Sequence, residues 1–509
     1  MALHTFIIPD PFYILGSTKK FCSKAVQNKI KGACDVNIKK AFGQPAPHSH
    51  PHLLGDDEVT PLIKKQEYQC RRQKLVDAVI KHAKKNCSHA ENHMIIIPST
   101  SKKYMSDKIP YVFRQNTDFL YLTGCQEPDT CAVITAGSHG SNHRVALFTR
   151  DKDDHAELWD GPRTHPEDAP GFFGVDQGLP MSDLSKYISS CKKALPHLSL
   201  WYDFEAAPHQ DIHKIVCDYL HDSSNKTFDS PRNFIHKLRL YKSTAEVALM
   251  QRSCDIASKA FIETMSYSRP GIGENQLFAK VDYECRVRGA EILAYPPVVA
   301  GGTRATTIHY INNNQLVFNN EMVLVDAGCE YHGYSSDITR TWPINGRFTN
   351  QQREIYEIVL DVQKELIDLC AKRPSLDALF ECMCLLLGKR LQELGLIGIQ
   401  PNNNYLMQAA YQLCPHHVSH YLGMDVHDTP TISRNIKLEP GMIVTVEPGI
   451  YITEKSGLPK EYHGIGIRIE DDVLITVNGP VVLSRKCPKD ICEVEQIASV
   501  GLEQCSKNV

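Results

Sequence analysis

The stretch MVLVDAGCEYHGYSSDIT, residues 322–339, determines how the C-terminal half of this chain is expected to fold. It begins with four apolar strand formers, reaches Asp326 at the end of that run, and arrives at Asp337 after a glycine-containing reversal. Alternate residues of a strand share a face, so Leu324 and Asp326 point to the same side, and the returning segment can bring Asp337 opposite them. The stretch therefore predicts an antiparallel hairpin with two neighbouring carboxylates.

Three later segments also place ionisable side chains among apolar residues. They are HHVSHYLGMDVHD (416–428), GMIVTVEPGIYI (441–452) and GIGIRIEDD (464–472). In the last two, Glu447 and Glu470 alternate with apolar residues, as on a strand with one packed face. Any one of these features alone is typical of a turn, a solvent-facing strand or a histidine-rich surface loop. Together, two aspartates, two strand glutamates and a histidine cluster indicate a functional site.

The acidic residues of such a site need compensating positive charge. Two carboxylates about 4 Å apart repel by about 4 kcal/mol at an effective dielectric constant near 20, and four in one pocket repel several times over. Two divalent cations would cancel four negative charges. Oxygen ligands with a single imidazole suit Mn²⁺, with Co²⁺ and Zn²⁺ as alternatives. Because a pair of such ions activates water and polarises a carbonyl, the expected reaction is hydrolysis of an amide or ester.

Length and composition limit the classes of protein to consider. The chain has 509 residues, 42% of them hydrophobic, which is enough for more than one domain with a large core. Lys and Arg total 56 against 59 Asp and Glu, and this net charge of -3 gives no electrostatic argument for nucleic-acid binding. No run approaches the roughly eighteen apolar residues of a membrane span. The 18 cysteines are scattered, which indicates a reducing compartment rather than a disulfide scaffold.

The sequence divides into three parts. Residues 1–60 form a basic leader, acid-poor over its first 55 residues, which we expect to be a mitochondrial transit segment or a disordered tail outside the core. Residues 61–237 contain strand-like runs such as MIIIPS (94–99) and helical spacing, and predict a smaller mixed α/β domain. Residues 238–500 predict an α+β domain with a sizeable antiparallel sheet. The first helix of this domain is expected to begin at Ser243, which can form a capping box with Glu246.

The order of the acidic and histidine residues resembles a known family. Asp326, Asp337, His420, Glu447 and Glu470, with the flanks HYLGMDVHD, TVEPGIYI and GIRIEDD, resemble the dinuclear metallopeptidases of the pita-bread fold, specifically the aminopeptidase P family. FRQNTDFLYLTGCQEPD (113–129) and AELWDGPR (156–163) are similar to the N-terminal domain of that family. The likeness covers about residues 60–495, and is strongest to the mitochondrial branch that includes intermediate-cleaving peptidases. It implies an α+β pita-bread catalytic domain preceded by the smaller N-terminal domain.

The resemblance also implies roles for individual residues. Asp326 would bind one metal ion, Asp337 and Glu470 would bind both, and His420 and Glu447 would complete the second. Glu447 would also move a proton from the attacking water to the leaving nitrogen. His427 and His416 would be catalytic, while the substrate would contact His309, His427 and Arg468. The alternatives for the last group are that His309 is a packed loop residue and that Arg468 pairs with Asp471 or Asp472.

The function implied by the resemblance is hydrolysis of the N-terminal Xaa-Pro bond of peptides or processed proteins. It implies two divalent cations, a homodimer, and a mitochondrial location with the cytoplasm as a second compartment. Four alternatives stay open. A prolidase of the same fold would take only dipeptides, a methionine aminopeptidase would remove the initiator residue, a creatinase-like enzyme would work without metal, and a scaffold protein would not be an enzyme.

Overall fold

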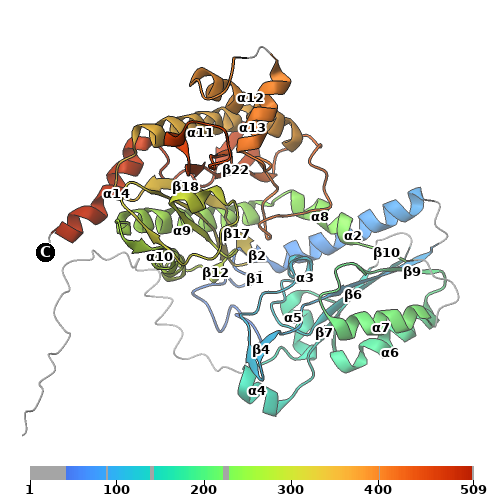
Figure 1. The fold of residues 1–509 in the computed structure, drawn as a ribbon. Coiled ribbons are helices and arrows are strands. Elements are labelled where there is room, and N and C mark those ends of the chain that lie inside the picture. The colour runs from blue at the N-terminus through green and yellow to red at the C-terminus, as the bar shows by residue number, and fades with distance from the viewer. Residues whose placement is uncertain (1–41, 87–89, 138–142, 222–227, 400–401, 507–509) are drawn as a thin grey trace, which may run out of the picture.

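The computed structural model describes residues 42–86, 90–137, 143–221, 228–399 and 402–506. The chain folds into an N-terminal half around one mixed sheet and a larger C-terminal half of helices around antiparallel strands (Figure 1). Helix α8 (Arg232–Leu240) runs across the division predicted between residues 237 and 238, so the two halves are joined by a continuous helix. A buried cluster that contains residues of both halves, among them Leu122 and Leu422, packs the halves together.

The N-terminal half is built on a six-stranded sheet of order β10-β9-β3-β6-β7-β8. Met94 and Ile96 of the central strand belong to the core under α6 and α7, while Ile95 and Ile97 pack in the core that contains α2, as alternation along a strand requires. The mixed α/β arrangement predicted from the sequence is therefore confirmed. The strands are β3 (Asn92–Pro98), β6 (Cys131–Gly137), β7 (Arg144–Thr149), β8 (Gln177–Pro180), β9 (Leu198–Trp201) and β10 (Phe228–Asp229). The helices are α2 (Lys65–Lys85), α3 (Thr117–Thr123), α4 (Asp154–Asp160), α5 (Ala169–Phe173), α6 (Leu184–Ala194) and α7 (Gln210–His221).

Residues 42–60 correct one expectation. The whole of residues 1–60 was expected to lie outside the core, but Ala46 and Val59 are fully buried in it. The side-chain amide of Gln44 donates to the carbonyl of Gly124 at 3.0 Å, and β1 (Glu58–Thr60) pairs with β2 (Ile63–Lys64). Apolar residues and backbone pairing anchor this segment, which has no Lys or Arg and carries the acidic run DDE (56–58) near its end, unlike the basic residues before it. Residues 1–41, which carry most of the predicted leader, lie outside the described residues.

The C-terminal half places six longer helices around short antiparallel strands (Figure 1). Helix α9 begins as predicted, because Ser243 and Glu246 form the reciprocal capping box. The helices are α9 (Thr244–Tyr267), α10 (Glu274–Val287), α11 (Asn350–Leu369), α12 (Leu376–Glu393), α13 (Asn403–Leu413) and α14 (Ile491–Ser506). The strands that hold the site are β13 (Val298–Gly301), β15 (Met322–Ala327), β18 (Ile338–Pro343), β19 (Ile443–Val446), β20 (Gly449–Tyr451), β21 (Gly466–Arg468) and β22 (Asp471–Thr476).

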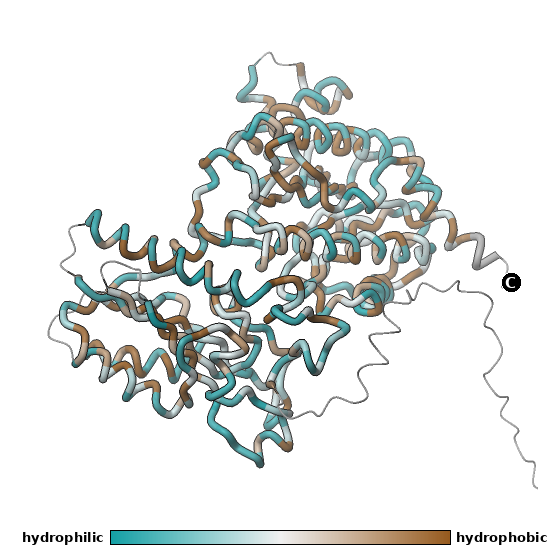
Figure 2. Tube along the Cα trace, turned by 180° about the vertical axis from the view of Figure 1, so that it is seen from behind, coloured by the Kyte–Doolittle hydropathy of each residue, from teal (hydrophilic) through white to brown (hydrophobic). Residues whose placement is uncertain are grey.

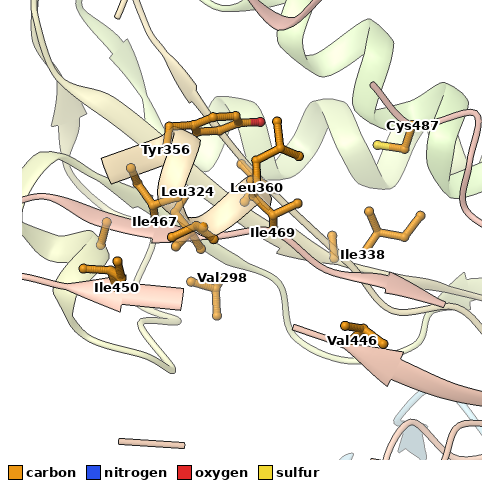
Figure 3. Close-up of a cluster of buried hydrophobic side chains, with 14 of the residues drawn as sticks. Val298, Leu324, Ile338, Tyr356, Leu360, Val446, Ile450, Ile467, Ile469 and Cys487 are labelled. Carbon is orange, nitrogen blue, oxygen red and sulfur yellow. The ribbon is translucent and has the colours of Figure 1, made fainter. Parts of the chain in front are cut away.

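The hairpin predicted from residues 322–339 is present. Strands β15 and β18 pair antiparallel, with Asp326 opposite Thr339. Between them a second small hairpin, β16 (Cys329–Tyr331) and β17 (Tyr334–Ser335), turns at His332 and Gly333, both with positive φ as a tight two-residue turn requires. Leu324 and Ile338 belong to the same buried hydrophobic cluster as Ile467 and Ile469 (Figure 3). This packing fixes the strand ends from which the carboxylates project.

Hydrophobic and hydrophilic segments alternate along the long helices, as expected for helices with one buried face (Figure 2). Among the described residues, no helix is both long enough and apolar enough to cross a bilayer.

Candidate active site

The five residues predicted as metal ligands come together at the strand ends of the C-terminal half. They are Asp326 in β15, Asp337 just before β18, His420 in the segment after α13, Glu447 just after β19, and Glu470 between β21 and β22. The backbone N–H of Glu470 donates to the carbonyl of Thr339 at 3.1 Å, and the hydroxyl of Thr339 donates to Glu470 Oε2 at 2.6 Å. Residues more than one hundred positions apart in the sequence are thus brought side by side by pairing of backbone segments.

Asp337 lies at the centre of the cluster. Its Oδ2 is 3.3 Å from Nε2 of His420, and its Oδ1 accepts a hydrogen bond of 2.5 Å from the hydroxyl of Tyr295. The same hydroxyl lies 2.6 Å from Oδ1 of Asp326. One ligand atom each from Asp337, His420 and Glu470 lie within 4.8 Å of one another, an arrangement that could hold a metal ion.

His420 and Glu447 form the next part of the cluster. Nδ1 of His420 lies 3.1 Å from the carbonyl oxygen of Tyr421, so the other ring nitrogen, Nε2, faces the carboxylates. Oε1 of Glu447 is 3.6 Å from that nitrogen and accepts a hydrogen bond of 3.4 Å from the hydroxyl of Thr445. The imidazole is therefore oriented as a ligand beside two acidic residues.

Acidic groups outnumber positively charged groups in the cluster, and this imbalance shifts their pKa values. Burial raises the pKa of Glu447 to about 7, and burial together with the charges of Asp337 and Glu447 raises the pKa of Glu470 well above its usual value. Burial lowers the pKa of His420, but the hydrogen bond with Asp337 and the charge of Glu447 outweigh it and raise the pKa to about 9. The hydroxyl of Tyr295 has one proton for two carboxylates. Divalent cations would supply the missing charge, so the donor set fits a metal centre.

Arg468 supports the cluster from beneath. It is 2% exposed, its Nη2 donates to Asp326 Oδ2 at 2.6 Å, and its Nη1 donates to the hydroxyl of Tyr451 at 2.8 Å. The alternative that it pairs with Asp471 or Asp472 is wrong. Asp471 instead accepts from Arg340 at 2.7 Å and from Lys489 at 2.6 Å. Nε of Arg468 also donates to Thr339 at 3.1 Å, so all three nitrogen atoms of its guanidinium donate hydrogen bonds to other residues of the protein.

The three remaining histidines lie around the ligands. Nε2 of His416 is 2.9 Å from the hydroxyl of Tyr451, and burial and the charge of Arg468 lower the pKa of His416 to about 4. The rings of His427 and His420 meet edge to face with centroids 4.5 Å apart. Burial and the neighbouring His420 lower the pKa of His427. His309 is exposed. His309 and His427 are solvent-accessible while the ligands are mostly buried.

Sequence reasoning missed two residues of the site and misjudged a third. Tyr295 bridges Asp326 and Asp337, and Tyr451 links Arg468 to His416. Asp472, considered only as a partner of Arg468, accepts the backbone N–H of Asp337 at 3.0 Å and the thiol of Cys254 at 3.1 Å. No periodic pattern singles out Tyr295 or Tyr451, since each stands in the sequence like any other tyrosine of a strand or loop.

Comparison with known proteins identifies the family of this chain. Residues 248–477 match metallopeptidase family M24, and residues 68–200 match the aminopeptidase P N-terminal domain. The chain is 45% identical over 464 residues to Xaa-Pro aminopeptidase 3 of Rattus norvegicus, covering 90% of each chain. It is 37% identical to Intermediate cleaving peptidase 55, mitochondrial, of Arabidopsis thaliana, covering 92% of this chain and 90% of the relative.

A solved structure shares most of this architecture. Proline aminopeptidase P II from Yersinia pestis superposes with a TM-score of 0.79 at 34% identity, covering 86% of this chain and 100% of that one. The fold predicted from the resemblance, a pita-bread catalytic domain preceded by an N-terminal domain, is therefore confirmed. This chain belongs to the aminopeptidase P family of M24 metallopeptidases, enzymes that hydrolyse peptide bonds with the help of metal ions.

Proposed function

We propose that this protein is a Xaa-Pro aminopeptidase that removes the first residue from peptides or processed proteins with proline in second position. The observation that carries the proposal is the convergence of ligand atoms from Asp337, His420 and Glu470 within 4.8 Å, in a chain of this family. Asp326 is linked to Asp337 by the hydroxyl of Tyr295, which contacts both carboxylates. Glu447 lies beside His420. These groups are the five that the sequence analysis selected.

The metal centre is proposed to contain two divalent cations. Asp326 would hold the first, His420 and Glu447 the second, and Asp337 and Glu470 both. The excess of carboxylate oxygens over imidazole nitrogens favours Mn²⁺, with Co²⁺ and Zn²⁺ as alternatives. When bound, such ions lower the pKa of water and polarise the carbonyl of the scissile bond.

The protein's own groups are proposed to position the substrate and move the proton. Glu447 takes the proton of the attacking water and delivers it to the proline nitrogen, which has no N–H and leaves as a secondary amine. His427 and His309, the exposed histidines, donate hydrogen bonds to the substrate. His416, held by Tyr451, lies near the leaving group. Because Arg468 is engaged with Asp326 and Tyr451, we now propose that it positions these residues instead of binding substrate.

Hydrolysis of an Xaa-Pro-Yaa tripeptide by metal-stripped protein tests the proposal. We expect no release of the first residue by the stripped protein and full release after Mn²⁺ is added back, because the ligand carboxylates cannot activate water by themselves. The measurement is liquid chromatography of the free amino acid over time. Absence of hydrolysis with Mn²⁺, Co²⁺ and Zn²⁺ alike would favour a scaffold protein, and hydrolysis without metal would favour a creatinase-like mechanism.

A dipeptidase of the same fold is the second candidate, and the same assay distinguishes it. The matched substrate is the Xaa-Pro dipeptide with the same first residue. The aminopeptidase proposal requires that kcat/KM be higher for the tripeptide than for the dipeptide. A preference for the dipeptide would identify a prolidase.

The proposed location is the mitochondrion, with the cytoplasm as a second compartment. A relative that carries the word mitochondrial in its name, at 37% identity, supports this location. The division into residues 1–60, 61–237 and 238–500 also stays a proposal, modified by the packing of residues 42–60 described above.

We propose in addition that the protein is a homodimer, formed through an apolar surface on the N-terminal half. This surface, which we call the α4 surface, consists of Tyr104, Met105, Ile109, Tyr111, Val112, Leu158 and Trp159. Leu158 and Trp159 are 80% and 78% exposed, unusually high for such side chains. A 2.9 Å ion pair from Lys102 to Asp160 joins its two parts, the strands β4 (Tyr104–Ser106) and β5 (Ile109–Pro110) and the helix α4 (Figure 1).

A second copy of the chain fits the charges around the α4 surface. The β4–β5 side carries Lys102, Lys103 and Lys108, whereas α4 and the residue before it carry Asp153, Asp154, Glu157 and Asp160. In a two-fold contact the same patch is used by both copies, so the basic strands of one copy can meet the acidic helix of the other.

Trp159→Asp is expected to convert the dimer to a monomer, because it places a charge in the centre of an apolar contact. Light scattering after size-exclusion chromatography measures the mass. The matched control is Val477→Asp, at a position that is 73% exposed in the C-terminal half, and it should leave the dimer intact. A wild-type monomer would contradict the homodimer, and a dimeric Trp159→Asp variant would place the interface elsewhere.

A further inference from the structure

A loop that carries His427 is held from the N-terminal half of the molecule. We call residues 424–431 the histidine loop. His427 stands in it between Asp425 and Asp428, and the ring of His427 contacts that of His420. His427 itself is exposed, and within the part of the chain that the structure describes no hydrogen bond holds its ring. The orientation of this side chain therefore depends on how the backbone on either side of it is fixed.

Arg239 fixes the loop from helix α8. It is 3% exposed; its Nη2 donates to Asp425 Oδ2 at 2.7 Å and also to Asp428. Its Nη1 donates to Asp118 Oδ1 at 2.6 Å, and Asp118 lies in α3 of the N-terminal half. One buried guanidinium thus joins both halves to the aspartates that flank His427. Buried charge-assisted hydrogen bonds of this kind are strong and fixed in direction.

Residues of the N-terminal half also contact the histidine loop directly. The hydroxyl of Thr117 donates to Asp425 Oδ1 at 2.7 Å. Arg114 donates through Nη2 to the carbonyl of Met424 at 2.8 Å and to Asp425 Oδ1 at 3.1 Å. Arg114 is itself held by Glu330, whose Oε2 is 2.6 Å from its Nε. Asp425 therefore accepts from three side chains, two of which belong to the N-terminal half.

These contacts keep Asp425 ionised and in place. Burial would raise its pKa, but the charges of Arg239 and Arg114 outweigh burial and lower the pKa of Asp425 to about 2. Removing one donor leaves a buried acceptor partly unpaired, and the backbone beside it can then relax. The position of His427, two residues further on, would change with it.

We propose that Thr117, Arg114 and Asp118 are positioning residues for hydrolysis, which act on the substrate through Asp425 and His427. The N-terminal half is then part of the catalytic apparatus, although none of its residues in this network is a metal ligand. The inference rests on the proposed function, in which His427 contacts the substrate. It adds that residues of the N-terminal half determine the orientation of the His427 side chain.

Thr117→Val tests the inference with minimal change of shape. Valine replaces the hydroxyl by a methyl group, so the donor to Asp425 is lost while the volume is kept. We expect kcat for a Xaa-Pro tripeptide to fall by about 10- to 100-fold, because small displacements of a substrate-positioning group have effects of this size. Metal content, measured by mass spectrometry, should be unchanged. Thr117→Ser restores the hydroxyl and should restore kcat.

Two further variants separate positioning from general loosening of the structure. Glu67→Gln alters another contact between the halves, the 2.7 Å hydrogen bond from Ser243 to Glu67, which does not involve the histidine loop, and it should leave kcat unchanged. In a His427→Asn background, Thr117→Val should cause no additional loss, since the residue through which it acts is already gone.

The outcomes are distinct. Wild-type kcat in Thr117→Val, combined with a strong defect in His427→Asn, would overturn the positioning inference and leave the proposed function standing. Wild-type activity in His427→Asn would overturn the role of His427 itself. Additive losses in the double variant would also contradict the inference. If Thr117→Val does not fold, Arg114→Lys provides the same test at a partly exposed site, because lysine keeps the charge but loses the forked geometry.

Discussion

Glu470→Gln is expected to abolish hydrolysis of Xaa-Pro peptides and, in the absence of metal, to leave the protein at least as stable as the wild type. Glu470 is buried, and the charges of Asp337 and Glu447 raise its pKa. Glutamine has the same shape and can still accept the hydrogen bond from Thr339. The substitution therefore removes repulsion from the apoprotein, but it also removes a ligand proposed to bind both cations.

Thermal unfolding of both proteins, once in chelator and once in Mn²⁺, measures how metal changes the stability of each. The wild type should gain about 2.7 kcal/mol of stability at a metal concentration 100 times Kd, whereas Glu470→Gln should gain much less. Glu284→Gln is the control, because Glu284 is a buried carboxylate outside the cluster that contacts Lys280 at 2.5 Å. The Glu284→Gln variant should be less stable than the wild type in chelator, and Mn²⁺ should stabilise it by as much as it stabilises the wild type. Normal activity or a full response to metal in Glu470→Gln would refute the proposed centre.

Glu447→Gln is expected to lower kcat by about 10²- to 10⁴-fold, the usual contribution of general acid–base catalysis. Glu447 lies 3.6 Å from His420 and 3.8 Å from His416, between the proposed metal ligands and the residue placed near the leaving group. The amide oxygen and nitrogen of glutamine occupy the same space but cannot carry the proton to the leaving nitrogen. Saturating Mn²⁺ in the assay separates this effect from weaker metal binding.

The choice of substrate shows which proton transfer Glu447 performs. An ester with the same first residue and a good leaving group needs little protonation when its bond breaks. If Glu447 delivers the proton to the proline nitrogen, Glu447→Gln should impair the tripeptide far more than the ester. Equal losses on both substrates would limit Glu447 to activation of the water or to metal binding.

Features that depend on neighbouring residues could be predicted from the sequence. The hairpin of residues 322–339 follows from alternation, and the start of α9 follows from the Ser243–Glu246 capping box. The five ligands could be selected because carboxylates among buried strands are costly without a purpose. Repulsion among these carboxylates already predicted a metal centre, and the resemblance then supplied the role of each residue in it.

Features that depend on long-range packing could not be predicted. Tyr295 reaches Asp326 and Asp337 because β13, which begins at Val298 shortly after it in the chain, pairs with β15. Arg239 meets Asp118 and Asp425 across more than one hundred residues each. Nothing in the local pattern of an arginine in a helix indicates such partners, since most arginines lie on the surface. The folding of residues 42–60 onto the N-terminal half was missed for the same reason.

The dispersal of the five proposed ligands between positions 326 and 470 has a consequence for the newly synthesised chain. If these residues hold the cations as proposed, a cation can be captured with full affinity only after Glu470 has left the ribosome and β21 and β22 have taken their places. Until then the nascent polypeptide has no complete centre and cannot cleave other chains emerging nearby. Proteolytic competence therefore arises at the end of folding, and loss of the native state removes it again.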